Sequence, residues 1–244
     1  MIDVMATETR AAPRQLSLPI RLRASSVFNS YHVGPNADVI AVLTDLPSVG
    51  PSPVVFVYGG AGVGKTHLLQ ALCARAGEQQ QQAAYLPLRE LHAYGPELLA
   101  GAEVMSLVCL DDIGMVLRDG AWNRALFSLH RELEERGGKL VLADEQPPAA
   151  IEFALKDLSS RVLAGTVLRV QALLESDQIA ALRLHARQRG LELPDDVAAF
   201  LLRRLPRDMS TLCAFLDELD VASLAEQRKL TIPFVKHVWA RQSS

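Results

Sequence analysis

The chain has 244 residues, of which 49% are hydrophobic and 22% charged, and its formal net charge is −3. This length predicts one α/β domain with a smaller appended domain, and the charge gives no Lys and Arg excess of the kind that strong non-specific DNA binding requires. The cysteines Cys73, Cys109 and Cys213 lie far apart without a Cys-x-x-Cys pair, which favours reduced structural thiols over disulfides or a zinc site. No apolar run reaches transmembrane length, and the first eight residues lack the apolar centre of a signal peptide, so we expect a cytoplasmic protein with no membrane partner.

The expected elements follow one another in two blocks after a tail. Residues 1–24 show no period and are expected to form a flexible tail. From residue 25 to 171, short β-rich runs alternate with helical runs, which predicts a parallel five-stranded sheet covered by helices. The expected strands are Val54–Tyr58, Ala84–Leu88, Met105–Leu110, Leu140–Ala143 and Thr166–Val170, and the expected helices include Thr66–Ala76, Trp122–Arg136 and Ala149–Leu158.

A glycine-rich stretch follows the first expected strand and opens the first expected helix. It reads G-x-x-x-x-G-K-T over residues 59–66, and its strand–loop–helix context favours a phosphate-binding loop over a tightly packed turn. In such a loop, backbone N–H groups point at phosphate oxygens, the lysine reaches the outer phosphates and the threonine hydroxyl binds Mg²⁺. The sequence therefore predicts that ADP or ATP with Mg²⁺ is bound by Gly59, Gly60, Ala61, Gly62, Val63, Gly64, Lys65, Thr66 and His67.

Acidic residues end two of the expected strands. Asp111 and Asp112 follow one apolar run, and Asp144 follows another. Because ligands bind outside the carboxyl ends of the strands of an open parallel sheet, we expect Asp111 to hold Mg²⁺ together with Thr66. Asp112 is a candidate to orient the attacking water, and Asp144 to sense the terminal phosphate through a water. The alternatives are an acidic strand end that only caps a turn, and a turn-forming Asp144 before two prolines.

From residue 172 to 244 only helical patterns remain, which predicts a small all-helical lid domain. Gly190 is expected to end its first helix, Pro194 to open the second and Thr231 to cap the last.

Two further segments complete a recognisable pattern, Tyr31–Asn36 and residues 229–236, which read KLTIPFVK. With the motifs above, they resemble the DnaA-type AAA+ ATPases over nearly the whole chain, and most of all their DnaA-homologous regulators, the Hda group. The resemblance implies an AAA+ nucleotide-binding domain over residues 25–171, a lid over 172–244, and adenine contacts from Val33 and Asn36. DnaA itself continues into a helix-turn-helix DNA-binding domain, and no basic recognition helix follows the lid in this sequence, so we expect a regulator rather than an initiator.

The tail carries a short peptide that resembles those with which replication proteins engage the DNA polymerase sliding clamp. Pro19 favours an extended backbone at the residue before it, and a flexible peptide of this kind docks its apolar side chains into a preformed groove. The alternative is an N-terminal strand packed on its own domain. The residues expected to bind the clamp are Gln15, Leu16, Ser17, Leu18, Pro19 and Ile20.

Arg161 lies in the segment that matches the family's arginine finger, which stabilises the charge that develops on a neighbouring subunit's triphosphate. On spacing alone it would be an ordinary surface arginine. The lid departs from the family pattern, because Ser210 stands where relatives carry a phosphate-contacting arginine, and Arg207 is the candidate substitute. We therefore expect weak hydrolysis in this chain's own site and a largely structural nucleotide.

These features predict a regulator that inactivates the replication initiator. Its tail would bind the clamp, which would bring the protein to DNA indirectly and associate it with the nucleoid, and Arg161 would stimulate hydrolysis of ATP held by DnaA. One alternative is a self-sufficient AAA+ ATPase, such as a helicase loader or clamp-loader-like motor, and another is a DnaA-like recruitment adaptor without catalytic effect. The sequence leaves open whether copies of this chain associate with one another.

Overall fold

The structure is a computed structural model that describes residues 26–46, 53–206 and 208–242. In these ranges the strands are β1 (Val54–Tyr58), β2 (Ala83–Pro87), β3 (Leu107–Asp111), β4 (Lys139–Asp144) and β5 (Thr166–Arg169). The α-helices are α1 (Ala37–Thr44), α2 (Lys65–Glu78), α3 (Leu88–Leu91), α4 (Gly120–Arg136), α5 (Lys156–Leu163), α6 (Glu175–Gln188), α7 (Asp195–Arg204), α8 (Met209–Glu226) and α9 (Ile232–Gln242). Short 3₁₀ turns are η1 (Phe28–Ser30), η2 (Gly34–Asn36), η4 (His92–Tyr94), η5 (Pro96–Leu99), η6 (Ala102–Val104), η7 (Ile113–Met115) and η8 (Pro148–Ala150).

The strands form one parallel sheet in the order β2-β3-β4-β1-β5, which confirms the predicted fold class. Each expected strand is present, with ends displaced by at most two residues. β1 pairs with β4 so that Tyr58 lies opposite Asp144, and β2 pairs with β3 so that Pro87 lies opposite Asp111. The glycine loop after β1 and the acids that end β3 and β4 therefore share one edge of the sheet.

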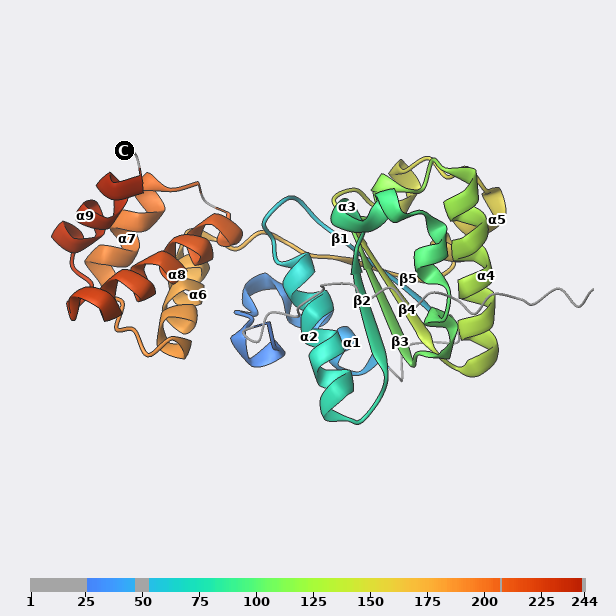
Figure 1. The fold of residues 1–244 in the computed structure, drawn as a ribbon, viewed down its shortest axis with the longest axis horizontal. Helices are drawn as coiled ribbons and strands as arrows, with labels where there is room; N and C mark the ends of the chain where they lie inside the picture. Colours follow the sequence, from blue (N-terminus) through green and yellow to red (C-terminus); the bar gives the residue numbers. More distant parts are fainter. Residues whose placement is uncertain (1–25, 47–52, 207, 243–244) are drawn as a thin grey trace, which may run out of the picture.

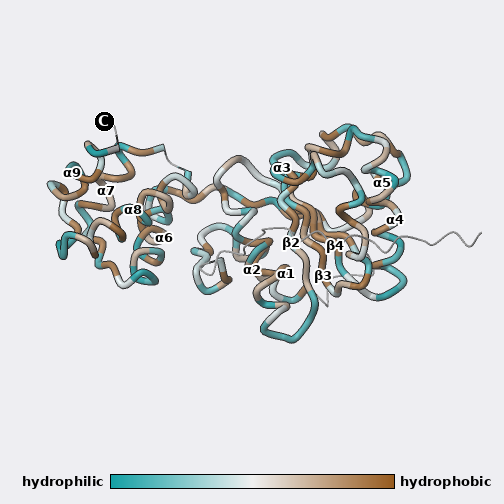
Figure 2. The backbone as a smooth tube through the Cα atoms, in the orientation of Figure 1, coloured by the Kyte–Doolittle hydropathy of each residue, from teal (hydrophilic) through white to brown (hydrophobic). Residues whose placement is uncertain are grey.

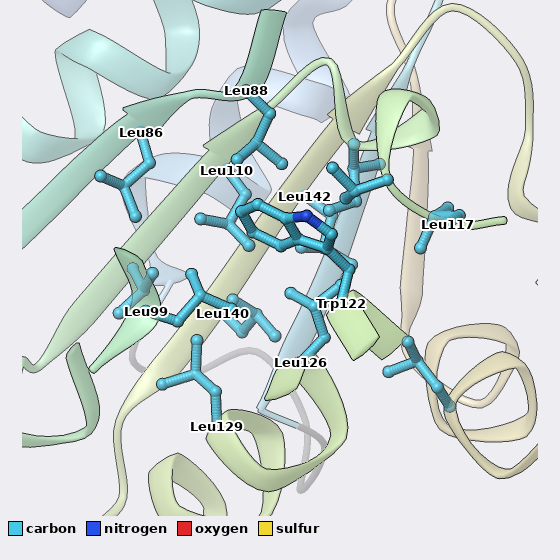
Figure 3. Close-up of a cluster of buried hydrophobic side chains, with 14 of the residues drawn as sticks. Leu86, Leu88, Leu99, Leu110, Leu117, Trp122, Leu126, Leu129, Leu140 and Leu142 are labelled. Carbon is cyan, nitrogen blue, oxygen red and sulfur yellow. The ribbon is translucent and has the colours of Figure 1, made fainter. Parts of the chain in front are cut away.

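Side chains alternate along the central strands between two hydrophobic layers. On one face, Leu110 and Leu142 pack with Trp122 and Leu126 of α4, as Figure 3 shows, and Phe56 belongs to the same cluster. On the other face, odd-numbered strand residues pack against α1 and α2, and Figure 1 shows the sheet between these two layers of helices. The most hydrophobic residues accordingly lie in the sheet, and many residues of the outer loops and helix faces are hydrophilic (Figure 2). The rigid sheet fixes the edge at which the site is built.

The helix expected over Ala149–Leu158 is wrong, because the only helical residues in that range before α5 belong to the short turn η8. Tertiary hydrogen bonds hold the segment between η8 and α5 extended: the Ala154 amide donates to the Leu117 carbonyl at 2.9 Å, and the Leu155 amide to Asn123 Oδ1 at 3.2 Å. These bonds take the place of the intrahelical ones, so the helix that carries Arg161 begins at Lys156.

The last four helices form a separate bundle with its own core, as Figure 1 shows. Gly190 follows α6 with a φ of 73°, which suits a residue without a side chain. Pro194 precedes α7, and the Phe234 amide donates to Thr231 Oγ1 at 3.4 Å at the start of α9. The predicted helix boundaries of the lid are thus confirmed. Across the described ranges, none of the helices has the length and apolar character that a membrane crossing needs.

Candidate functional site

A cavity of about 680 Å³ lies where the lid meets the carboxyl edge of the sheet. Its volume falls in the range of pockets that hold small ligands and cofactors. The glycine loop and the start of α2 line one side, the acids after β3 another, and α6 and α8 the third. The lining residues include Tyr31, His32, Ala61, Gly62, Val63, Gly64, Lys65, Thr66, His67, Gln70, Arg89, Asp111, Asp112, Ala181, His185, Arg189, Ser210, Ala214 and Asp217.

Two glycines allow the loop its shape. Gly62 has a φ of 72° and Gly64 a φ of 100°, values that side chains disfavour. A Cβ at Gly64 would lie 2.8 Å from Tyr31 Cε2, and one at Gly62 would lie 2.5 Å from Cβ of Asp208 in the lid. Gly64 is the N-cap of α2, so the first N–H groups of this helix are turned toward the cavity, where they suit an anion.

Lys65 is buried beneath the loop. Its Nζ donates to the carbonyls of Gly59 at 2.7 Å and Gly60 at 2.9 Å. Gly59 and Gly60 do not line the cavity themselves, and they hold the lysine through their backbone. This arrangement places a cation at the floor of the loop.

Thr66 and Asp111 are brought together as the sequence predicted. The Thr66 hydroxyl donates to Asp111 Oδ2 at 2.6 Å, and the buried Tyr85 hydroxyl donates to the same oxygen at 3.0 Å. Burial raises the pKa of Asp111, because the ionised carboxylate loses water that these two bonds only partly replace. Burial and the neighbouring Asp111 likewise raise the pKa of Tyr85 well above its usual range.

These observations fit a nucleoside phosphate with a divalent cation. The glycine loop and Lys65 supply donors and positive charge for phosphate, and Thr66 with Asp111 supplies the hard oxygen ligands that Mg²⁺ prefers. Within the described ranges no group of three or more His, Cys, Asp or Glu side chains could hold a metal. A cation at Thr66 and Asp111 would therefore complete its octahedron with phosphate oxygens and water.

Asp112 lines the cavity but is already paired. Arg89 donates to both of its carboxylate oxygens, from Nε at 2.9 Å and from Nη2 at 3.2 Å. The φ of Asp112 is 55°, in the left-handed region. The residue predicted to orient the water is thus held by a cation that the sequence motifs did not indicate.

Asp144 does not line the cavity. Its carboxylate accepts from the Gly114 amide at 2.7 Å and from the Gln146 amide at 3.2 Å, so it ties β4 to the loop after β3 and forms the turn before the two prolines. This geometry favours the turn-forming alternative, and the phosphate-sensing role remains a prediction.

Val33 and Asn36, the predicted adenine contacts, also lie outside the cavity lining. The Asn36 side chain is buried, donates to the Gln171 carbonyl at 3.0 Å and accepts from the Gln171 amide at 2.7 Å. It thereby fastens the 31–36 segment to the chain leaving β5. Tyr31 and His32 of the same segment line the cavity, and burial raises the pKa of Tyr31 to about 12.

The lid faces the cavity with residues that have no sequence motif. His32 Nε2 lies 3.2 Å from Oδ1 of Asp177 in α6, and the ring centroids of His67 and His185 are 6.1 Å apart. Burial, aided by His67 and Arg189, lowers the pKa of His185 to about 4. Ser210 does line the cavity, as its alignment with the family's lid arginine predicts, whereas Arg207 lies outside the described residues.

Arg189 is a second lid residue that the sequence analysis missed. It donates from Nε to Asp217 Oδ1 at 2.7 Å and from Nη1 to the His185 carbonyl at 2.8 Å. Ser210, Ala214 and Asp217 follow one another at helical spacing along α8, as do Ala181, His185 and Arg189 along α6 and its C-cap. This spacing would have identified the face of the lid that lines the cavity.

Arg161 is an exposed residue of α5, on the far side of the sheet from α2. Among the described residues no hydrogen bond or ion pair to its guanidinium is found. Burial lowers the pKa of His130, and the charge of Arg161 adds to that shift. It is absent from the lining of the cavity. The peptide predicted to bind the clamp, Gln15 to Ile20, lies outside the described residues, and its role stays a prediction.

Comparison with known proteins agrees with this architecture. Residues 175–239 match the family model described as the Hda lid domain. Domain III of the replication initiation protein DnaA from Thermotoga maritima has the same fold, with a TM-score of 0.74 and 20% sequence identity, over 90% of this chain and 97% of that one. AMPPCP-bound DnaA from Aquifex aeolicus gives a TM-score of 0.69 at 19% identity, over 84% of this chain and 68% of that one.

A further solved structure gives a weaker likeness. A variant of RuvB from Thermotoga maritima has a TM-score of 0.56 and 14% identity, over 82% of this chain and 64% of that one. At such identities the likeness shows the fold, and the lid match adds the sequence signal. Together the comparisons show a DnaA-like fold over most of the chain and a match to the Hda lid domain over residues 175–239, in agreement with the resemblance that the sequence carries.

Proposed function

We propose that this protein inactivates the replication initiator DnaA by stimulating, in trans, the hydrolysis of DnaA-bound ATP while a peptide in its tail holds it to the sliding clamp. The match of the C-terminal bundle to the Hda lid domain carries this proposal. With the DnaA-like fold, it supports a DnaA-related AAA+ replication regulator. DnaA-ADP would be the inactive product, so the origin would not fire again.

The chain's own cavity would hold ADP or ATP with Mg²⁺. Lys65 and the N-terminus of α2 would bind the phosphates, and Thr66 and Asp111 would bind the cation. A nucleotide between loop and lid would fix the angle at which the two domains meet, because α6 and α8 line the same cavity as the loop. Its role would be structural, since Asp112 is engaged by Arg89 and Ser210 brings no charge to the phosphates.

Arg161 would act outside this cavity. Its exposed position on α5 leaves the guanidinium accessible to another subunit. Against the triphosphate of DnaA it would stabilise the charge that develops during phosphoryl transfer, an effect of about 10³–10⁵ in rate in other nucleoside triphosphatases.

A hydrolysis assay tests this proposal against its rivals. DnaA loaded with radiolabelled ATP is followed in a single turnover with clamp on DNA, with and without this protein. Stimulation that requires the clamp is expected. Fast turnover by the protein without DnaA would favour a self-sufficient motor, and binding to DnaA without stimulation would favour a recruitment adaptor.

The tether is tested separately by retention on immobilised clamp. Replacing Gln15, Leu18 and Pro19 together by alanine is expected to abolish retention while nucleotide binding is unchanged. Retention of the triple variant would contradict the assignment of the peptide.

A further inference from the structure

One buried polar atom in the cavity has no partner. Oε1 of Gln70 is almost completely buried and accepts no hydrogen bond from the described residues. The residue is 6% exposed and lines the cavity. A buried acceptor without a donor is unfavourable, and in native proteins such atoms generally belong to a site whose ligand or water supplies the donor.

The position of Gln70 on α2 points to the cation end of the cavity. It lies four residues after Thr66, so the two side chains project from the same face of the helix. Thr66 donates to Asp111 Oδ2, and Tyr85 donates to the same oxygen. Gln70 therefore lies beside the oxygen pair that fits Mg²⁺.

Tyr85 limits which end of the Gln70 amide it could bind. Because the Tyr85 hydroxyl gives its proton to Asp111, its oxygen can act towards Gln70 only as an acceptor. A bond between the two side chains would therefore use the Gln70 amide nitrogen and leave the carbonyl oxygen as the free acceptor. A network of Tyr85, Asp111 and Thr66 thus holds one acceptor in place for an incoming donor.

We propose that Gln70 Oε1 accepts a hydrogen bond from a water molecule bound to the Mg²⁺ that Thr66 and Asp111 hold with the nucleotide. Mg²⁺ keeps several of its waters when it binds to proteins with phosphates, and groups that contact such outer ligands set metal affinity and geometry. Gln70 is thus a positioning residue for the cation. This inference rests on the proposed nucleotide and cation site, and it is independent of any action on DnaA.

The experiment measures binding of Mn²⁺, as a stand-in for Mg²⁺, to the full chain with ADP. The decrease of the free Mn²⁺ signal in electron paramagnetic resonance gives the cation affinity, and a fluorescent ADP analogue gives nucleotide affinity with Mg²⁺ and with EDTA. Gln70→Met, which keeps the shape but removes the acceptor, is expected to weaken Mn²⁺ binding about 10-fold or more. Nucleotide affinity in EDTA is expected to stay within about twofold of the wild type.

Two further variants separate this role from a structural one. Gln70→Glu keeps an oxygen acceptor and is expected to retain Mn²⁺ binding. Tyr85→Phe leaves Gln70 Oε1 in place but removes the hydroxyl that donates to Asp111, and is expected to give an intermediate loss of Mn²⁺ affinity. The proposal would be overturned if Gln70→Met lowered nucleotide affinity equally with Mg²⁺ and with EDTA. It would also be overturned if Gln70→Met bound Mn²⁺ as tightly as the wild type. Absence of any cation-dependent binding in the wild type would overturn the cation site itself, and with it this inference, whatever the result with DnaA.

Discussion

Among single residues, Lys65 is the one whose substitution tests nucleotide binding most simply. Its Nζ is bonded to two loop carbonyls and would turn to phosphate oxygens when a nucleotide binds. Lys65→Ala is expected to lower nucleotide affinity by about 10- to 100-fold, because hydrogen bonds to charged groups contribute about 1.5–3 kcal/mol each. Isothermal titration with ADP and Mg²⁺ measures this effect. Arg75→Ala removes an exposed cation from the other end of α2 and is the matched control, expected to bind like the wild type.

Arg89 predicts a second residue-scale effect. Its two bonds to Asp112 neutralise that carboxylate and occupy both oxygens, so Asp112 is poorly placed to orient a water. Arg89→Ala is expected to raise ATP turnover by the isolated protein a few-fold, measured as phosphate release. Unchanged or slower turnover would show that Arg89 does not restrain this site.

Much of the site's chemistry was predictable residue by residue, and the exceptions have physical reasons. Thr66 and Asp111 lie 2.6 Å apart because a local motif and a strand end meet at a sheet edge, which sequence patterns do indicate. The side chains of Asn36 and Asp144 could equally well bind a ligand, but each accepts a hydrogen bond from a backbone amide elsewhere in the fold. Arg89 belongs to no motif, and only three-dimensional contacts bring it to the site. Gln70 belongs to no motif either, although it lies one helical turn after Thr66 on α2.

At the scale of elements, the contact between the glycine loop and the lid depends on Gly62. An added Cβ would lie 2.5 Å from Cβ of Asp208, the N-cap of α8, at a φ of 72°. Gly101 has a φ of 87° but nothing within 4 Å of an added Cβ, so Gly101→Ala reports backbone strain alone. That strain is about 1–2 kcal/mol. Gly62→Ala is expected to be more destabilising than this control and to weaken nucleotide binding, measured by thermal unfolding with and without ADP. Equal effects of the two variants on both measurements would contradict a close loop–lid contact.

The pKa of His185 predicts how stability changes with pH. Burial lowers its folded pKa to about 4 from the ordinary 6.5, so between these values the unfolded chain binds the additional proton. The free energy of unfolding is therefore expected to fall as the pH drops from about 6.5 to 4, with the stabilisation complete above 6.5. Urea unfolding at several pH values measures this, and His185→Gln is expected to show a shallower fall. Parallel curves for the two proteins would contradict the assignment.

The prediction of elements failed where tertiary contacts replaced local preference. The strands were found because each is a short apolar run, and the central ones are buried on both faces. The helix expected from Ala149 was not found, because Leu117 and Asn123 hold Ala154 and Leu155 in extended conformations. Those partners lie more than 30 positions earlier in the chain, beyond the reach of a local pattern.

Across the two domains, the chain has two proposed functional surfaces that lie apart from each other. The cavity beneath the lid would bind a nucleotide that shapes the protein, and Arg161 on α5 would serve the nucleotide of another. We therefore expect Lys65→Ala and Arg161→Ala to lose the stimulation of DnaA-ATP hydrolysis for different reasons. The first is expected to lose its own nucleotide, and the second to keep it, as the nucleotide co-purified with each variant would show by mass spectrometry.

The role of Arg161 is tested by the rate of DnaA-ATP hydrolysis in a single turnover, with clamp on DNA and either Arg161→Ala or Arg124→Ala. Arg124 is an exposed arginine of α4 and serves as the control. The account predicts that Arg161→Ala loses the stimulation, by about 10³-fold where the finger acts fully, while Arg124→Ala stimulates as the wild type does. Stimulation by Arg161→Ala at the wild-type rate would contradict it.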